Sequence, residues 1–514
     1  MNQPGQSQTA SASSRTLPVA VFDRLVSNIA TAERDPRKSL IGFALSWIAF
    51  FFIFYVMPTP EGLSPAGKAT LAVVAWACIT WVSECVPVGI SGLMIPMLLV
   101  MTKAVPGLGA AVGGISSNPA ILTLVAFIVA AIILVSGLDK RIALGILHRA
   151  RIKTVNGVIW GMFAVNMILA MIIPGANPRG AILLPIMNGI TGLLGDTPEE
   201  REAKKAIVIQ SMVYASMISG MCLMTAHLPN LILVGLFEKE LKITITYFDW
   251  FLMQWPYLGM FVVTQWWVQY HFKTRNFAIR GGAEMIKKTH DQLPKTSTTE
   301  FTILAIFVLT AILWMTEKWH KIPTLMIAIM SLSVMFIPGF MPFRWKMLEE
   351  RTIWGTFILL GGALSLSSAM SSSGLGKWLA AAIEPVAVGK PWWMVLLILM
   401  LGTHVIRLGM LSNVAAVALF APIILALAPK VGLHPVAFTM LVTDTDTFAY
   451  ILPTQITVAV IAYSTGTFSS TDYAKVGWVS VLLAIAYGIF VMAPWYAFLG
   501  IPVWDPNAPW PFAK

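Results

Sequence analysis

A polar break interrupts an apolar run in the stretch MIIPGANPRGAILLPIM, residues 171–187. It brings Gly175, Asn177 and Arg179 together, and the twelve residues on either side of the arginine carry no charge. A charge in such a run is a functional candidate by default, because an unpaired charge is costly at membrane depth. The alternative is an arginine that reaches the membrane surface. Asn177 and Pro178 also suit the start of a helix, whose free N–H groups bind anions.

Three further polar interruptions carry side chains suited to the same chemistry. They contain His227, Pro229 and Asn230; Ser412, Asn413 and Val414; and Thr454 and Gln455. Arg407 precedes Asn413 by six residues, so we expect the second half to be cationic as well. Asp444 and Asp446 are cation or proton candidates, and a wet helix end is the alternative. Non-helical backbone at membrane depth must line a cavity or be buried in protein. The four interruptions therefore predict a polar cavity.

A purely structural role is the alternative for two of these residues. His227 would be a satisfied interior histidine, and Arg407 would lie at the cytoplasmic edge of its helix. The three cysteines show no metal-ligand spacing, so no cofactor is expected.

Membrane-spanning helices must position these breaks. The 514 residues are 57% hydrophobic and 11% charged, whereas soluble domains carry about 25% charged residues. The apolar runs are continuous rather than alternating, which indicates helices. Since a span needs about 20 such residues, we expect an all-α polytopic membrane protein with about 11 transmembrane helices and several shorter apolar pieces.

The basic residues indicate topology rather than a nucleic-acid partner. The net charge is +11, and lysines and arginines gather near span ends. Such residues mark cytoplasmic loops. We therefore place an N-terminal tail (1–38) and a central basic loop (272–300) in the cytoplasm of a bacterial-type inner membrane.

An internal repeat relates the two halves of the chain. Ser136-Gly137-Leu138 matches Ser373-Gly374-Leu375, and each motif is followed 47 residues after its leucine by a proline, Pro185 or Pro422. Repeats with broken helices are typical of secondary transporters, which bind substrate between their halves. The predicted organisation is a first half (39–271) with a hairpin around 157–194, a second half (301–500) with a hairpin around 393–428, and a tail (501–514).

These residues resemble the divalent anion/sodium symporter (DASS) family of di- and tricarboxylate transporters. The likeness runs from about residue 69 to 490, with Glu84 and Pro87 placed as in the family's Trp-x-x-Glu-x-x-Pro helix. Ser412-Asn413-Val414 resembles its hairpin signature Ser-Asn-Thr. The resemblance implies two re-entrant hairpins, inverted-topology repeats, and scaffold and transport subdomains. We expect a homodimer in a lipid bilayer that carries a small organic anion by an elevator-type motion.

The first half departs from the family's motifs. Gly175-Ala176-Asn177 stands in place of Ser-Asn-Thr, and the Gly-Thr-Pro-Pro-Asn motif is half retained around His227 and lost near Gln455. In the family these groups hold sodium ions and substrate carboxylates. Our hypothesis is that Arg179 replaces a coupling sodium and offers a carboxylate a bidentate fork. Sodium-independent anion exchange would follow, and the alternative is a symporter that binds sodium at Ser412 and Asn413.

Two other classes fit less well. GISG (Gly89–Gly92) matches an intramembrane serine-protease tetrapeptide, but a nucleophilic serine needs a base and none is recognisable, so an enzyme is not expected. A cation/proton antiporter would need acidic residues at the breaks, which instead hold Asn, Arg and His. The sequence leaves the anion, the direction of transport and proton coupling open.

Overall fold

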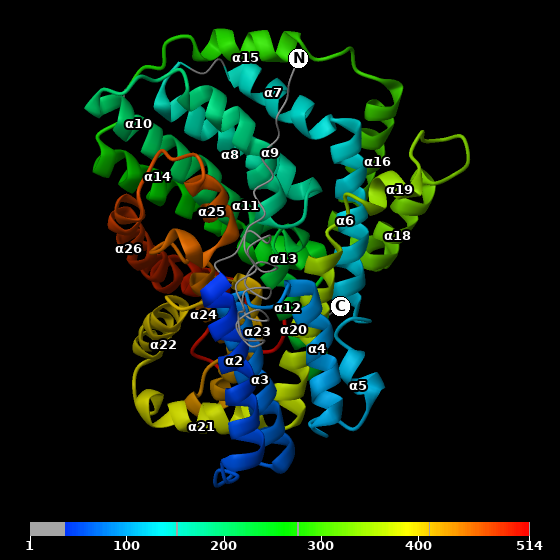
Figure 1. The fold of residues 1–514 in the computed structure, drawn as a ribbon, viewed down its shortest axis with the longest axis vertical. Helices are drawn as coiled ribbons and strands as arrows, with labels where there is room; N and C mark the ends of the chain where they lie inside the picture. Colours follow the sequence, from blue (N-terminus) through cyan, green and yellow to red (C-terminus); the bar gives the residue numbers. More distant parts are fainter. Residues whose placement is uncertain (1–35, 151–152, 275–276, 411, 513–514) are drawn as a thin grey trace, which may run out of the picture.

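The protein is a bundle of helices. The computed structural model describes residues 36–150, 153–274, 277–410 and 412–512 (Figure 1). The helices up to the central loop are α2 (Pro36–Phe51), α3 (Pro65–Ser83), α4 (Val88–Met101), α5 (Leu108–Val112), α6 (Asn118–Ser136), α7 (Leu138–Ala150), α8 (Val155–Ile172), α9 (Ala176–Thr191), α10 (Pro198–Val208), α11 (Ala215–Cys222), α12 (Leu228–Leu241), α13 (Tyr247–Gln254) and α14 (Leu258–Phe272).

The second half continues in the same way. Its helices are α15 (Gly282–Asp291), α16 (Thr298–Met315), α17 (Glu317–His320), α18 (Thr324–Met335), α19 (Trp345–Glu349), α20 (Trp354–Ser372), α21 (Leu375–Ala387), α22 (Trp392–Arg407), α23 (Asn413–Leu427), α24 (Pro435–Thr447), α25 (Thr457–Tyr463), α26 (Ser470–Tyr487) and α27 (Ala493–Phe498). Short π-helical turns extend or join helices at Phe52–Val56, Ile209–Tyr214 and Gly488–Met492, and 3-10 turns lie at Met224–Ala226, Trp255–Tyr257, Ala428–Val431 and Pro453–Gln455.

The prediction of an all-helical, multi-pass membrane protein is confirmed, with a lower count of full spans. Nine helices within the described residues are long and apolar enough to cross a membrane. The sequence predicted about 11, since its count also took in apolar runs shorter than the roughly 20 residues that a span needs. Three apolar helices fall short of that length: α4, α18 and α22 have 14, 12 and 16 residues.

The connecting segments differ in detail from their predicted forms. Helix α2 begins at Pro36, inside the expected tail, whose residues 1–35 lie outside the described part of the chain. The basic loop contains α15, which lies across one end of the molecule (Figure 1). The C-terminal tail, described to residue 512, packs on the second half: the His434 N–H donates to the Val503 carbonyl at 2.9 Å.

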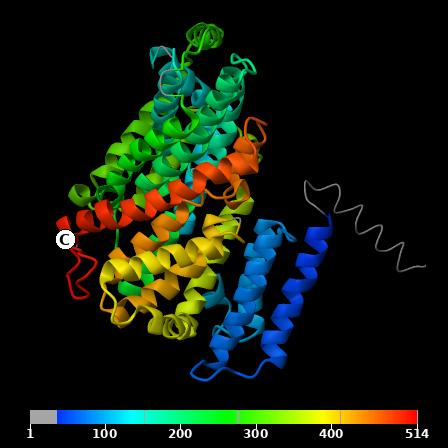
Figure 2. The same ribbon diagram turned by 90° about the vertical axis from the view of Figure 1, so that its left-hand side faces the viewer.

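Repeat-related elements lie at opposite ends of the long axis. Helix α7 lies near the end that carries α15, whereas its counterpart α21 lies across the other end (Figure 1). The pair α8–α9 and the pair α22–α23, which cover the two predicted hairpins, are likewise in opposite halves. The α2–α3 pair stands at the side of the bundle (Figure 2).

The GISG tetrapeptide is a helix-packing element. A Cβ added to Gly362 of α20 would lie 2.4 Å from the Gly92 carbonyl oxygen of α4, so the two backbones touch at this crossing. The Ser91 hydroxyl is also occupied, since it accepts a hydrogen bond from Trp81 Nε1 at 3.1 Å. Small residues that permit close helix approach are typical of membrane interfaces, so this motif is accounted for without catalysis.

Candidate functional site

Four helices begin around one cavity of about 80 Å³. Helices α9, α12, α23 and α25 each follow a non-helical break in the chain, and their first residues line the cavity. The free N–H groups and the positive end of the dipole at a helix N-terminus attract anions. The described residues that line the cavity include no Asp or Glu. The arrangement therefore suits a small anion.

Seven of the residues predicted from the sequence line this cavity, and five do not. The lining residues are Gly175, Asn177, His227, Pro229, Ser412, Asn413 and Val414. The others, Arg179, Asn230, Arg407, Thr454 and Gln455, are not part of its wall.

Asn177 and Ser412 occupy the starts of the two hairpin helices α9 and α23. The Asn177 side chain is exposed and makes no hydrogen bond within the described part of the chain, so its amide is available to a ligand. Ser412 caps α23, since its Oγ accepts from the Ala415 N–H at 3.3 Å. Asn177 is therefore the freer of the two polar groups.

Asn413 connects the cavity to a buried arginine. Its Oδ1 accepts from Arg407 Nη2, and its Nδ2 donates to His227 Nε2 at 3.3 Å. Because Nε2 accepts, the ring proton of His227 lies on Nδ1. That Nδ1 is buried with no hydrogen-bond partner among the described residues, which leaves one donor at the cavity wall unused.

Arg179 is fully buried behind the cavity and is bonded to backbone. Its Nη1 donates to the carbonyl oxygens of Ile173 and Ala226, both at 3.0 Å. Its Nη2 donates to the Ser216 carbonyl at 2.7 Å. Both terminal nitrogens therefore donate to backbone, while Nε is buried without a partner among the described residues and Arg179 does not line the cavity, so the predicted carboxylate fork stays a prediction. The guanidinium is instead a cation held by carbonyl oxygens of broken helices, the type of ligand that binds coupling ions in transporters.

Arg407 has the same kind of surroundings in the second half. It is fully buried, with Nη1 at 3.5 Å from the Met410 carbonyl oxygen and Nη2 at 3.4 Å from that of Gln455. Its Nε lies 3.6 Å from Asp446 Oδ2, so this arginine also has a buried ion-pair partner. Arg407 is therefore enclosed within the protein, and its depth in the membrane stays a prediction.

The two arginines reach equivalent carbonyls from non-equivalent positions. Ile173 and Met410 differ by the offset of the repeat, and each lies in the break of its hairpin. Ala226 and Gln455 each end the 3-10 turn of a later break. Arg179, however, comes from the helix after its hairpin break and Arg407 from the helix before it. Each half thus places one guanidinium against the same pair of carbonyl positions.

Comparison with known proteins assigns the family. A family model described as "Sodium:sulfate symporter transmembrane region" matches residues 38–502. The chain belongs to this family. The DASS resemblance predicted from the sequence is thereby confirmed, and the protein is a membrane transporter rather than an enzyme.

Relatives of this family member cover most of its length. A membrane protein of Cupriavidus necator is 28% identical over 90% of this chain and 94% of its own. The sodium-dependent dicarboxylate transporter SdcS of Staphylococcus saprophyticus is 24% identical over 91% of this chain and 93% of its own. The crystal structure of the Alcanivorax borkumensis YdaH transporter, at 12% identity and a TM-score of 0.54, covers 86% of this chain and all of its own. That likeness concerns the fold alone.

In this sodium:sulfate symporter family member, three of the predicted residues lie outside the cavity wall. Asn230 and Gln455 support the breaks, and Thr454 is exposed. Asn230 Nδ2 donates to the carbonyls of Gly220 (3.1 Å) and Leu223 (3.0 Å), which holds the end of α11. Gln455 holds the later break in the same way, because its Oε1 accepts from two backbone N–H groups of that break. Thr454 is exposed and does not line the cavity.

The two aspartates of α24 also lie away from the cavity wall. Asp446 pairs with Arg407, and Asp444 Oδ2 accepts from Gln254 Nε2 at 2.7 Å. Both are buried, so neither lies at a wet helix end.

Sequence reasoning missed the apolar part of the cavity wall and one hydroxyl. The missed residues are Ala176, Met217, Leu228, Ile456 and Thr457. Thr457 is the first residue of α25, as Leu228 is the first residue of α12, and each follows a 3-10 turn by two residues.

Proposed function

We propose that this transporter carries a small organic anion of the di- or tricarboxylate class and exchanges it without sodium. The observation that supports this is the placement of Arg179 and Arg407 against equivalent carbonyl pairs. In a sodium-coupled carrier such carbonyls would face a dissociable ion. Here each carbonyl pair is satisfied by a side chain that cannot leave.

The charge balance favours the same mechanism. A substrate anion at the meeting point of four helix N-termini is stabilised by the dipoles and by the two guanidinium groups behind them. Arg407 is paired with Asp446, whereas Arg179 has no ion pair within the described residues, so without the anion its charge is uncompensated in a low-dielectric interior, which costs several kcal/mol. An empty site would therefore cross the membrane poorly, and transport would depend on an anion for the return step.

The substrate class is inferred from relatives and from the donors in the site. SdcS is named as a sodium-dependent dicarboxylate transporter, and the family model as a sodium:sulfate symporter. Asn177, the His227 Nδ1–H and the helix N-termini are all hydrogen-bond donors, as a carboxylate or a sulfate requires. The carboxylate class is our primary assignment.

The movement is inferred from the arrangement of the repeats. The opposite placement of α7 and α21 supports inverted-topology repeats, with the α8–α9 and α22–α23 hairpins in one transport subdomain. We propose an elevator-type motion of this subdomain against a scaffold, in a homodimer, with the basic loop in the cytoplasm.

A sodium-coupled symporter that uses the second hairpin is the alternative. It would need oxygen ligands from Ser412 and Asn413. Asn413 Oδ1 already accepts from Arg407, and Ser412 Oγ accepts from a backbone N–H. Both oxygens are thus engaged, which favours exchange.

Counterflow in proteoliposomes tests the proposal. Vesicles loaded with a mixture of dicarboxylates, or left empty, receive radiolabelled succinate in sodium or in choline medium. We expect uptake that requires internal anion and ignores sodium. Uptake into empty vesicles driven by a sodium gradient would support the symporter, and no uptake in any condition would contradict the dicarboxylate assignment. The exposed-arginine variant Arg351→Ala is the matched control for variants of the buried arginines.

A further inference from the structure

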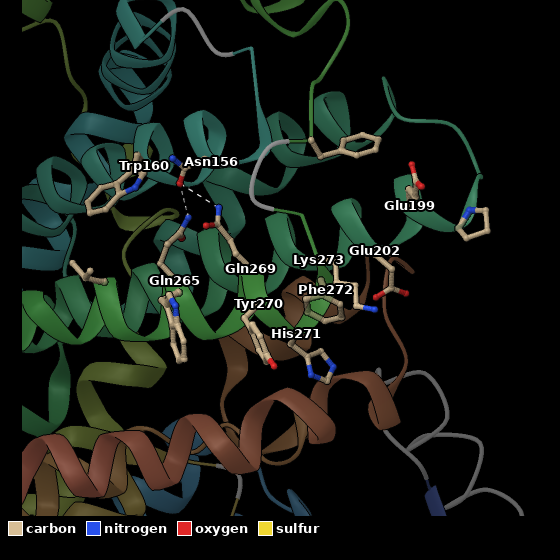
Figure 3. A pocket seen from close by; sticks show the side chains of 14 residues that line it. Asn156, Trp160, Glu199, Glu202, Gln265, Gln269, Tyr270, His271, Phe272 and Lys273 are labelled. Carbon is tan, nitrogen blue, oxygen red and sulfur yellow. Dashed lines mark hydrogen bonds between the residues drawn. The ribbon is translucent and has the colours of Figure 1, made fainter.

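A second, much larger hollow lies away from the substrate cavity and shares no lining residue with it. It measures about 1230 Å³ and is lined by the starts of α8 and α10, the second half of α14 and the turn after it (Figure 3). We call it the α8–α10–α14 hollow. Helix α8 and the continuous helix Pro198–Cys222, which begins with α10, are candidate spans whose first residues line the hollow, so the hollow lies at the depth of the membrane surface. The neighbouring basic loop assigns that surface to the cytoplasmic side.

The inner wall of the hollow is polar and incompletely satisfied. Asn156 Oδ1 accepts from Gln265 Nε2 at 2.9 Å and from Gln269 Nε2 at 3.2 Å (Figure 3). Gln265 is 4% exposed, and its Oε1 is buried with no partner among the described residues. A buried acceptor without a donor calls for an explanation. This oxygen is enclosed by protein, and the three amide side chains around it make the inner wall polar, which suits a lipid headgroup rather than an acyl chain.

The rim carries both signs of charge. Helix α10 contributes Glu199 and Glu202, and the end of α14 contributes Lys273 (Figure 3). Glu202 pairs with Lys205 at 2.8 Å, whereas Glu199 and Lys273 have no ion pair within the described chain. The rim therefore offers one free carboxylate and one free ammonium, which suits a ligand that is itself zwitterionic.

An apolar strip leads from the rim along the membrane-facing side of α14. Val262, Trp266 and Tyr270 are spaced four residues apart, so they share one helix face. Their exposed fractions are 52, 60 and 67%. The rings of Trp266 and Tyr270 stack at 5.8 Å with an interplanar angle of 13°. Such a strip, with aromatic side chains at the interface, suits an acyl chain.

We infer that the α8–α10–α14 hollow binds a phospholipid whose headgroup carries a primary ammonium, that is, of the phosphatidylethanolamine class. Its phosphate would lie at Lys273, its ammonium at Glu199, and one acyl chain along the α14 strip. A choline headgroup has no N–H to donate to the Glu199 carboxylate. A glycerol headgroup has no cation for Glu199 and brings a net negative charge to the carboxylates of the rim.

Lipid titration of the purified protein, followed by native mass spectrometry, tests the inference. The probes are dioleoyl phosphatidylethanolamine, phosphatidylcholine and phosphatidylglycerol. We expect the ethanolamine lipid to bind about tenfold more tightly than the choline lipid, which corresponds to one charge-assisted hydrogen bond. Equal binding of the three lipids, or preference for phosphatidylglycerol, would overturn the inference.

Two surface variants, each with a matched control, locate the binding. Glu199→Gln should remove the preference for ethanolamine over choline, whereas Glu240→Gln, an exposed glutamate of α12, should keep it. Lys273→Ala should weaken the binding of all three lipids to the same extent. Its control is Lys242→Ala, because both lysines cap their helices with positive φ, 55° and 57°. The inference would be overturned if Glu199→Gln and Lys273→Ala bound the lipids as their controls do. It would also be overturned if they changed the number of subunits seen in the same spectra and left lipid binding unchanged.

Discussion

Replacing Arg179 by alanine should make the stability of the protein depend on sodium. The variant removes the donor from three buried carbonyls, those of Ile173, Ala226 and Ser216, and leaves space between them. Carbonyl oxygens around a vacated site are suitable ligands for a hard cation. We therefore expect Arg179→Ala to lose exchange and to bind sodium where the guanidinium lay.

The size of the effect follows from the three lost hydrogen bonds. Each hydrogen bond from the charged guanidinium contributes about 1.5–3 kcal/mol, and the relief of burying one charge fewer offsets part of the sum. We expect a net destabilisation of about 3 kcal/mol without sodium. Sodium at about 100 times its Kd would stabilise the variant by about 2.7 kcal/mol, which restores nearly all of the lost free energy of unfolding.

Thermal unfolding of the purified variant in sodium chloride and in choline chloride measures this directly. The Tm of Arg179→Ala should rise with sodium, and that of the parent protein and of Arg351→Ala should not. Counterflow in the same two media should show loss of exchange in Arg179→Ala. A variant with parental exchange, or with a Tm that ignores sodium, would refute the view that the guanidinium replaces a coupling cation.

Three further changes probe the site and its supports. Asn177→Ala removes a free amide from the cavity wall and should lower the rate of counterflow at subsaturating substrate by about tenfold, since one hydrogen bond to a charged group contributes about 1.5–3 kcal/mol. Asp446→Asn leaves Arg407 without its ion-pair partner and should destabilise the protein by about 3–5 kcal/mol, measured as a lower Tm. Gly477→Ala places a Cβ 1.6 Å from the Tyr450 carbonyl oxygen, so we expect a large loss of folded protein on size-exclusion chromatography.

Matched controls lie on the same or similar elements. Asn188→Ala changes an exposed asparagine at the other end of α9 and should leave counterflow at the parental rate. Gly402→Ala adds a Cβ with no atom within 4 Å and should fold normally. Parental counterflow in Asn177→Ala would remove that residue from the site. A parental Tm in Asp446→Asn would mean that Arg407 is stabilised by its other acceptors.

The features that could be predicted are those that depend on residues close together in the sequence. A proline or glycine inside an apolar run indicates a broken helix, so the breaks near Gly175 and Ser412 were predictable, as was their repeat. The partner of a long side chain is not a local property. Arg179 and Arg407 were predicted to face substrate, whereas each reaches a carbonyl more than 40 residues away. Thr457 was missed because its position depends on how α25 packs, which no spacing in the chain encodes.

The arginines held by carbonyls have an electrical consequence. A coupling ion binds on one side of the membrane and is released on the other, so it carries charge in one direction. A tethered guanidinium travels with the protein in both directions, and its charge cancels over a full exchange cycle. Only the difference in charge between the imported and the exported anion then works against the membrane potential, at about 2.3 kcal/mol per charge per 100 mV. Exchange of anions of equal charge by this protein should be electrically silent, and accumulation should draw on the gradient of the second anion alone.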